Sequence, residues 1–423
     1  MASNDALPRL FPRHFRHTTT ALGVAAVLTV ALTACGGGSG SGGGSDTIQL
    51  GAEASLTGPG AAVGGPQTNG IQMAVDEINA AGGVKIGGKS VKLGLQTLDD
   101  QSRATLAVQN VQKMLQGGGS HYIVGTLSSS SVGAYLPIIK DRDDVISMVS
   151  GAVLPGITDN KPVYRFQTET KQLDDGTGNV LLSKGAKKVA MLTDKSHASY
   201  VGNTDSFVRK LGAAGISVAT QQQYQFGDTQ YGAQVEAMLR TAPDALLFRG
   251  YATDLIRAIT TARQLGFTGP IVSSAGYTDQ EVTDANAAPV MHDVTDVGSP
   301  PVDYVASAAG GFDATLTANA KKFADDYQAR FHQAPGLLSA NGYESVYLLA
   351  GAWAKAGSAT DIPKVRTALD GLKPADVTAN AVLPVSGNTV FANHQTIFAL
   401  VGLTYGNGHW APSGKVDSTL GPA

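Results

Sequence analysis

Apolar and polar positions follow two alternating periods along most of the chain. From residue 47 onward, short β-branched runs are each followed by a turn and then by apolar residues at every third or fourth position. The first pattern predicts strands and the second predicts amphipathic helices. The predicted strands are residues 47–52, 91–97, 122–124, 145–149, 188–193, 216–223, 245–249 and 270–273.

Helices are predicted between these strands. Ile71, Val75 and Ile78 form one apolar stripe, and further helices are expected near residues 106–115, 132–139, 207–213 and 255–265. Strands that alternate with helices predict parallel sheets covered by helices on both faces. The pattern restarts at Gly185, and the strands are too many for one comfortable sheet. We therefore predict two doubly wound α/β lobes.

The loops that follow the strands are the candidate site. Two doubly wound lobes direct the carboxyl ends of their strands toward a shared crevice, where ligands bind. The loops in question are residues 55–60, 126–131, 150–154, 194–200, 249–253 and 274–278.

A run of serines, residues 128–131, lies in one of these loops, between a predicted strand and a predicted helix. A serine there caps the helix, and the free N–H groups of a helix start bind carboxylates. Tyr200, Tyr251 and Tyr277 lie on second-lobe loops, where they are placed to stack on a ligand or to hydrogen-bond it. The alternatives are plain capping for the serines and packing for the tyrosines.

The N-terminus has the layout of a bacterial lipoprotein signal. A basic stretch precedes an apolar run at 21–32, and Leu-Thr-Ala then leads to Cys35, the only cysteine of the chain. The run is shorter than the roughly 20 residues that a spanning helix needs. We predict a signal peptide over 1–34, and a lipidated Cys35 with a Gly/Ser tether over 35–45. The alternatives are a transmembrane anchor or an ordinary cleaved signal.

Composition narrows the class of protein further. The chain has 31 basic and 34 acidic residues and no basic tract after Cys35, so we expect no nucleic-acid partner. A single cysteine allows no intrachain disulfide, so the exported body must be stable from its core alone. We expect the protein on the extracytoplasmic face of the cell membrane, held there by its lipid.

Residues 83–90 match the phosphate-binding pattern G-x-x-x-x-G-K-[ST]. That loop needs a strand before it and a helix after it, whereas here a helix precedes and a strand follows. We interpret the segment as a helix-to-strand turn. The chain also lacks G-x-S-x-G and H-E-x-x-H motifs, and its histidines lack metal-ligand spacing. We expect no enzyme activity, no metal and no cofactor.

Residues 47–398 resemble the Leu/Ile/Val-binding family of type I solute-binding proteins, which feed ABC importers. The stretches that carry the resemblance are residues 55–59, 69–83, 98–102, 123–129, 185–192, 243–246 and 343–350. The resemblance implies two lobes joined by a three-crossing hinge, the type I periplasmic-binding fold. Lobe 1 would comprise 46–168 and 302–378, and lobe 2 would comprise 169–301 and 379–423. The lobes would close on a small ligand and present it to a permease, or, in the alternative reading, to a signalling partner.

The resemblance also implies site residues. Carboxylate-holding positions of the family fall on Ser129, Ser130 and the loop Gly151, Ala152, Val153, and its second-lobe aromatics fall on Tyr200 and Tyr251. The acid that meets an α-ammonium would fall at Ala275, which with Tyr277 would form a specificity wall. A threonine usually stands where this chain has Val153.

Two ligand hypotheses follow from these departures. Either the ligand is an aliphatic amino acid whose ammonium is met by Asp279, carbonyls or tyrosine hydroxyls, or it carries no ammonium. The second class includes aromatic or aliphatic carboxylates and amides. The absence of an acid at Ala275 favours the second hypothesis, because a buried ammonium without a counter-charge is costly.

Overall fold

The computed structural model describes residues 47–421 except 117–118, 308–310 and 386. Cys35, the signal peptide and the tether lie outside these residues, so the structure does not test them. Residues Ser45–Ala423 form one compact unit. Among the described residues, no helix combines the length and apolarity that a membrane crossing requires.

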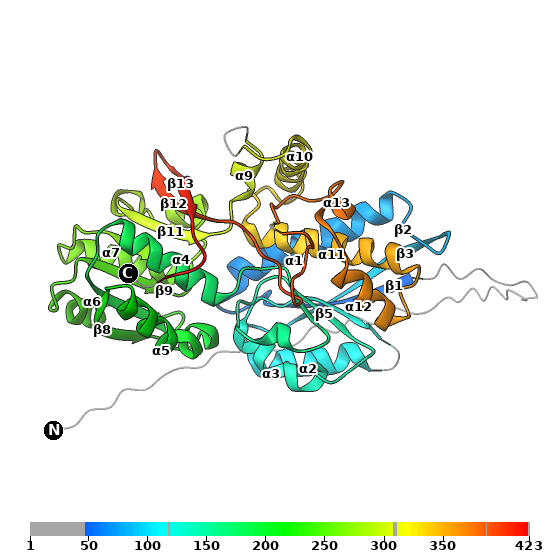
Figure 1. Cartoon of the computed structure of the whole chain (residues 1–423), viewed down its shortest axis with the longest axis horizontal. Helices are drawn as coiled ribbons and strands as arrows, with labels where there is room; N and C mark the ends of the chain where they lie inside the picture. Colours follow the sequence, from blue (N-terminus) through cyan, green and yellow to red (C-terminus); the bar gives the residue numbers. More distant parts are fainter. Residues whose placement is uncertain (1–46, 117–118, 308–310, 386, 422–423) are drawn as a thin grey trace, which may run out of the picture. The chain divides into compact units, whose positions relative to one another are not determined.

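The first lobe is built on a six-stranded sheet in the order β2-β3-β1-β4-β5-β6 (Figure 1). All pairs are parallel except β2 with β3. The strands are β1 (Thr47–Ala54), β2 (Val84–Ile86), β3 (Lys89–Asp99), β4 (Tyr122–Gly125), β5 (Ile146–Val149) and β6 (Val163–Arg165). The helices are α1 (Ala61–Ala80), α2 (Ala104–Leu115), α3 (Ser129–Ile139), α9 (Val302–Val305), α10 (Ala314–Phe331), α11 (Leu337–Ala356), α12 (Ile362–Asp370) and α13 (Pro374–Val377).

The second lobe is built on a seven-stranded sheet in the order β13-β12-β11-β10-β9-β7-β8. Only β12 and β13, at one edge, are antiparallel. The strands are β7 (Lys188–Asp194), β8 (Ser217–Tyr224), β9 (Ala245–Arg249), β10 (Ile271–Ser273), β11 (Val294–Gly298), β12 (Leu400–Gly406) and β13 (His409–Val416). The helices are α4 (Thr170–Ser183), α5 (Ala198–Ala213), α6 (Gly232–Leu239), α7 (Ala252–Gln264) and α8 (Asp279–Asp284).

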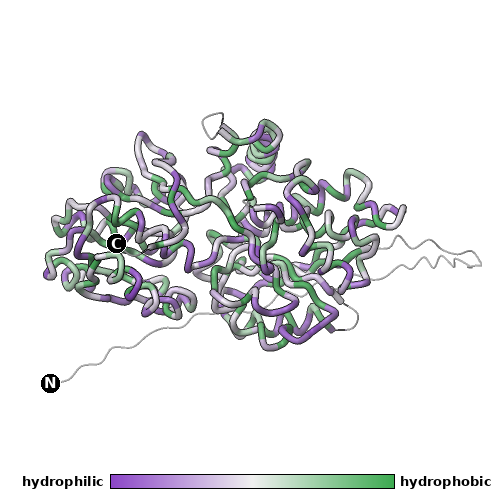
Figure 2. The backbone as a smooth tube through the Cα atoms, in the orientation of Figure 1, coloured by the Kyte–Doolittle hydropathy of each residue, from purple (hydrophilic) through white to green (hydrophobic). Residues whose placement is uncertain are grey.

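Each sheet carries apolar residues on both faces. In the first lobe, one core lies against α1 and α11 and another against α2 and α3. The second lobe likewise has two core clusters. Hydrophobic and hydrophilic stretches alternate at short intervals along the backbone of both lobes (Figure 2). The predicted fold class, two α/β lobes with mostly parallel sheets, is confirmed.

The segment that matches the phosphate-loop pattern folds as a β-hairpin. Strand β2 pairs antiparallel with β3, and Gly87 and Gly88 form the turn with φ values of 55° and 83°. Positive φ at both turn residues suits glycine. The predicted helix-to-strand turn was therefore wrong in detail, because a short strand intervenes. No helix follows the loop, so the segment lacks the geometry that cradles a phosphate.

The chain passes between the two sheets after β6, after β11 and before β12. Arg165, the last residue of β6, has a fully buried side chain and links the start of the first passage to the segment that precedes the third. It forms an ion pair of 2.9 Å with Glu169, and its carbonyl accepts a 3.0 Å hydrogen bond from the N–H of Thr396. The hydroxyls of Thr168 and Ser299 lie 2.9 Å apart and join the first and second passages. Hydrogen bonds thus connect the first passage to the second and to the segment that precedes the third.

The third passage begins later than expected. A set of apolar residues after residue 378 packs into the core of the first lobe: Val382, Leu383, Val390, Phe391 and Phe398. The chain joins the second sheet only at β12. The boundary expected at residue 379 is therefore corrected to a point after Phe398.

Candidate ligand-binding site

A cavity of about 290 Å³ lies between the two lobes, at the carboxyl ends of their strands. The first lobe contributes residues after β1, β3 and β4, and the second lobe contributes residues after β7, β8 and β9. This volume lies at the lower end of the range for ligand pockets, so the cavity suits a small solute. Its lining residues are Ser55, Pro59, Gly60, Ser102, Leu127, Ser128, Ser129, Ser130, Ser196, His197, Gln225, Phe226 and Tyr251.

Four helices begin at this cavity. Their N-cap residues are Gly60 for α1, Ser128 for α3, His197 for α5 and Tyr251 for α7, and all four line it. A helix N-terminus carries a partial positive charge. Two helices from each lobe therefore create a potential that favours an anion and disfavours a cation.

The cavity lining, as the described residues define it, carries no formal charge. Its single titratable base is His197, and burial together with Arg249 lowers the pKa of this imidazole to about 3. His197 is therefore neutral at physiological pH. The Arg249 guanidinium does not line the cavity, because it faces Asp174 inside the second lobe, with N···O distances of 3.0 and 2.7 Å.

The serine run forms the first-lobe wall and touches the second lobe. Ser128 is the N-cap of α3, and its Oγ accepts hydrogen bonds from the N–H groups of Ser130 (3.2 Å) and Ser131 (3.4 Å). The hydroxyl of Ser130 donates to the carbonyl of Ser196 across the cavity mouth, at 3.1 Å. The lobes thus meet directly in this structure, which is a closed arrangement.

Two adjacent acids brace this wall from behind. Asp100 is fully buried and accepts hydrogen bonds from the hydroxyls of Ser55 (2.7 Å) and Ser131 (2.8 Å). Asp99 accepts hydrogen bonds from the N–H of Leu56 (2.9 Å) and the hydroxyl of Thr57 (2.6 Å). The pair fixes the loop after β1 against the start of α3. Their role is to shape the wall.

The second-lobe wall is aromatic. The His197 ring lies 5.1 Å from the Tyr251 ring, and Tyr251 lies 4.6 Å from Phe226. Tyr200 supports His197 from behind at 4.3 Å, and its hydroxyl donates to the carbonyl of Ser274 at 3.1 Å. A polar wall on one lobe therefore faces an aromatic wall on the other.

Of the predicted site residues, Ser129, Ser130 and Tyr251 line the cavity. The loop 150–154 lies behind the first-lobe wall. A Cβ on Gly151 would lie 2.8 Å from Gln67 Nε2, the N–H of Ala152 donates to the carbonyl of Thr126 (3.1 Å), and Val153 packs against the second-lobe core. In this arrangement these three residues do not face the cavity.

The predicted second-lobe residues beyond Tyr251 are also engaged elsewhere. The N–H of Ala275 donates to Asp296 at 2.7 Å. Tyr277 stacks on Trp410 with a ring separation of 5.0 Å, and Asp279 accepts a 2.8 Å hydrogen bond from the N–H of Trp410. Asp279 therefore does not line the cavity, although it was one of the groups expected to meet an ammonium.

Sequence reasoning missed several residues of the lining. The loops 55–60, 126–131, 194–200 and 249–253 were expected from their position after strands, and each contributes to the cavity. The loops after β3 and β8 were not named, although the same rule applies to them. The residues missed are Ser55, Pro59, Gly60, Ser102, Leu127, Ser196, His197, Gln225 and Phe226.

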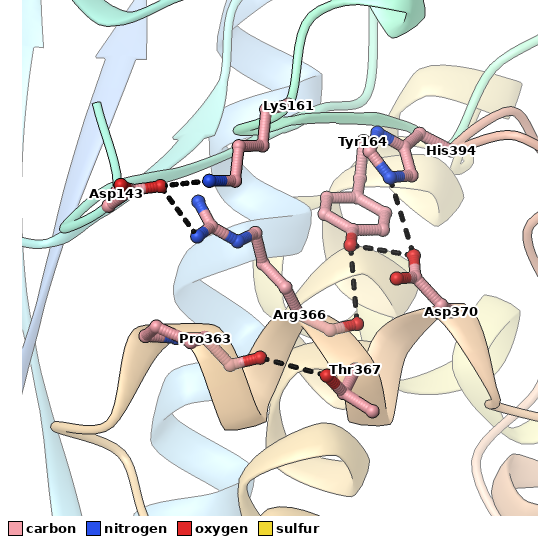
Figure 3. Close-up of a pocket in the computed structure, with 8 residues that line it drawn as sticks. All are labelled: Asp143, Lys161, Tyr164, Pro363, Arg366, Thr367, Asp370 and His394. Carbon is pink, nitrogen blue, oxygen red and sulfur yellow. Dashed lines mark hydrogen bonds and ion pairs between the residues drawn. The ribbon is translucent and has the colours of Figure 1, made fainter. Parts of the chain in front are cut away.

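A second cavity of about 410 Å³ lies in the first lobe, next to the amino ends of β5 and β6. Figure 3 shows that its charged groups pair with one another. Asp143 pairs with both Arg366 (3.1 Å) and Lys161, and Asp370 accepts a 2.8 Å hydrogen bond from the Tyr164 hydroxyl. Each charged group of this cavity therefore already has a partner within it. No group of three or more metal-ligating side chains occurs among the described residues.

Comparison with known proteins identifies the family. The sequence profile described as "Periplasmic binding protein" matches residues 47–401. The chain belongs to this family. It is 28% identical to the Leu/Ile/Val-binding protein BraC3 of Rhizobium johnstonii, over 76% of this chain and 83% of that protein. It is 26% identical to a leucine-, isoleucine-, valine-, threonine- and alanine-binding protein of Pseudomonas aeruginosa, over 77% of this chain and 82% of that protein.

Solved structures share the fold of this periplasmic binding protein. A leucine-binding protein, LivK, of Thermotoga maritima superposes with a TM-score of 0.75 at 21% identity, covering 88% of this chain and 99% of that chain. A solute-binding protein of R. palustris in complex with benzoate superposes with a TM-score of 0.73 at 18% identity, covering 87% and 96%. The predicted type I, Leu/Ile/Val-binding-like family is thus confirmed, and the relatives are solute-binding proteins.

Proposed function

We propose that this protein is a lipid-anchored, extracytoplasmic receptor that captures a small carboxylate without an ammonium group and delivers it to an ABC permease. We infer the ligand class from one observation: four helices begin at a cavity whose lining carries no formal charge. An anionic head group gains from these helix starts, and the lining itself holds no negative charge that would repel it. Relatives of the same family include Leu/Ile/Val-binding proteins and a benzoate complex.

An amino-acid ligand would need an acid for its ammonium. Asp194, the acid behind the second-lobe wall, is fully buried, and its Oδ1 accepts a 2.8 Å hydrogen bond from the N–H of Ser196. Its Oδ2 has no partner among the described residues, and burial raises its pKa. An amino acid would therefore have to reach past Ser196 to this carboxyl group. The variant Asp194→Asn distinguishes an amino-acid ligand from a carboxylate that has no ammonium group. It should abolish binding of an amino acid and leave binding of an ammonium-free carboxylate unchanged.

Capture follows from closure of the lobes. A ligand that contacts both walls binds the closed form better than the open form, and only this difference shifts the population. Ser130 and Ser196 already meet across the mouth, so a bound solute is screened from water. Replacing both Ser129 and Ser130 by alanine should weaken binding at least tenfold. Unchanged affinity would remove these hydroxyls from the binding role.

Thermal melting of the chain from residue 45 onward tests the ligand class. Leucine and 4-methylpentanoate have the same carbon skeleton and differ only in the ammonium group. A ligand at 100 times its Kd adds about 2.7 kcal/mol to stability, so binding is visible as a raised melting temperature. We expect a shift with 4-methylpentanoate or benzoate and none with leucine. A shift with leucine, isoleucine or valine would overturn the ligand class.

Anchoring and delivery have separate tests. Palmitate labelling of the expressed protein should be lost in Cys35→Ser, and labelling that survives this change would contradict the anchor. Cells that lack the protein should lose uptake of the radiolabelled ligand. Normal uptake together with a lost transcriptional response would favour the signalling role instead.

A further inference from the structure

The second-lobe wall combines flat aromatic faces with one polar side chain that has a free nitrogen. His197 is 8% exposed and lines the cavity. Its Nδ1 lies 2.8 Å from the hydroxyl oxygen of Ser199, and its Nε2 has no hydrogen-bond partner among the described residues. The rings of Tyr251 and Phe226 continue the wall, each about 5 Å from its neighbour. The wall therefore offers both stacking and a hydrogen bond.

A chain of hydrogen bonds from the first lobe reaches Nδ1 of His197. The N–H of Val153 donates to Ser129 Oγ at 3.3 Å, and the Ser129 hydroxyl donates to Ser199 Oγ at 3.4 Å. We assign the Ser199 proton to the contact with His197 Nδ1, since the Ser199 oxygen already accepts from Ser129. Since His197 is neutral, an acceptor role for Nδ1 places the ring proton on Nε2. The free nitrogen is thus an N–H donor on the cavity wall.

We propose that the solute is an aromatic carboxylate whose ring stacks on Tyr251 and Phe226, and that His197 is a specificity-determining residue whose Nε2–H donates to the carboxylate. This inference rests on the proposed capture of an ammonium-free carboxylate and names its class. An aromatic pair contributes beyond its buried area, so the wall discriminates an aromatic ring from a saturated one. Because the imidazole is neutral, His197 contributes a hydrogen bond to the carboxylate but no positive charge. The link through Ser129 and Ser199 forms only when the lobes meet, so closure also orients the donor.

Two probes separate the two parts of the proposal. Benzoate and cyclohexanecarboxylate share a carboxylate and a six-membered ring, and only benzoate is aromatic. We expect calorimetric titration of the chain from residue 45 onward to give at least threefold tighter binding of benzoate. Phe226→Leu should remove most of this preference while changing the affinity for cyclohexanecarboxylate little. His197→Phe keeps a ring but removes the donor, and it should weaken both acids at least tenfold.

Controls separate the failure of this inference from the failure of the proposed function. Leu265→Ala, at the far end of α7, should leave both affinities unchanged, and unliganded melting checks that each variant folds. If the protein bound benzoate and cyclohexanecarboxylate with equal affinity, and Phe226→Leu weakened both equally, the proposal of an aromatic ligand would be overturned. The proposed capture of a carboxylate would not be affected by this result. Unchanged affinity in folded His197→Phe would overturn the role of His197. Binding of leucine in place of both acids would overturn the proposed ligand class itself.

Discussion

Removing the guanidinium of Arg249 should destabilise the second lobe in a pH-dependent way. Arg249 lies at the end of β9 and donates two hydrogen bonds, of 3.0 and 2.7 Å, to Asp174 on α4. Both side chains are only 1% exposed. Arg249→Met preserves much of the apolar stem and leaves the Asp174 carboxylate buried without its counter-charge. The guanidinium also lies 4.8 Å from the Tyr200 ring, a contact that is lost as well.

The expected loss is about 3–5 kcal/mol near neutral pH, the usual cost of leaving one partner of a buried pair unpaired. Burial already raises the pKa of Asp174, even though Arg249 opposes this shift, and the variant loses the opposing effect. A folded-state pKa above the unfolded value means that folding takes up a proton, so stability falls as the pH rises. The loss of unfolding free energy in the variant, relative to the wild type, should therefore be smaller at pH 4.5 than at pH 7.5.

Urea denaturation at these two pH values measures the deficit. Lys321→Met is the matched control, because it breaks an ion pair with Asp325 in which both side chains are about two-thirds exposed, and it should cost less than about 1 kcal/mol. The double variant Arg249→Met/Asp174→Leu should lose less than the single variant, since no buried charge remains. A single-variant loss below about 1 kcal/mol, or one that is equal at both pH values, would refute the reasoning.

Two further predictions concern the first lobe. Burial raises the pKa of Glu344 to about 8, so this carboxyl group should make stability fall as the pH rises between roughly pH 4.3 and 8. Glu344→Gln should flatten this slope in urea denaturation, and an unchanged slope would contradict the assignment. In α1, a Cβ on Gly70 would lie 1.9 Å from the Ser339 carbonyl oxygen, whereas a Cβ on Gly65 would meet nothing within 4 Å. Gly70→Ala should therefore lower the free energy of unfolding by about 2–3 kcal/mol. Gly65→Ala should raise it by about 0.5–1 kcal/mol. If both substitutions changed the free energy of unfolding in the same direction, the α1–α11 packing would be refuted.

The sequence was most informative where local pattern decides structure. Strand β9 was predicted over the residues that it occupies, and β1 and β7 to within two residues at one end, because parallel strands that are buried on both faces read as short, nearly continuous apolar runs. The edge strands β12 and β13 were missed. They are an antiparallel hairpin rather than a strand–helix unit, and the signal was present in the turn Asn407-Gly408, whose φ values are 53° and 86°.

The site was predictable as loops but less so as side chains. Strand order assigns the loops at the carboxyl ends to the crevice, whichever way their side chains turn. Which residues face the cavity depends on where the two lobes meet, and that is a long-range property. His197 illustrates this limit, because its place on the wall depends on Tyr200 behind it and on a hydrogen-bond chain that reaches Ser129 on the other lobe.

Calorimetric titration of the chain from residue 45 onward with 3-phenylpropanoate and with phenylalanine shows whether the cavity accepts a carboxylate and rejects an ammonium group. The two compounds differ only in the ammonium group. We expect 3-phenylpropanoate to bind and phenylalanine to bind at least about 100-fold more weakly, because an uncompensated buried ammonium costs several kcal/mol and each 1.4 kcal/mol is tenfold in affinity. Phenylalanine binding as tightly as 3-phenylpropanoate, or more tightly, would contradict it.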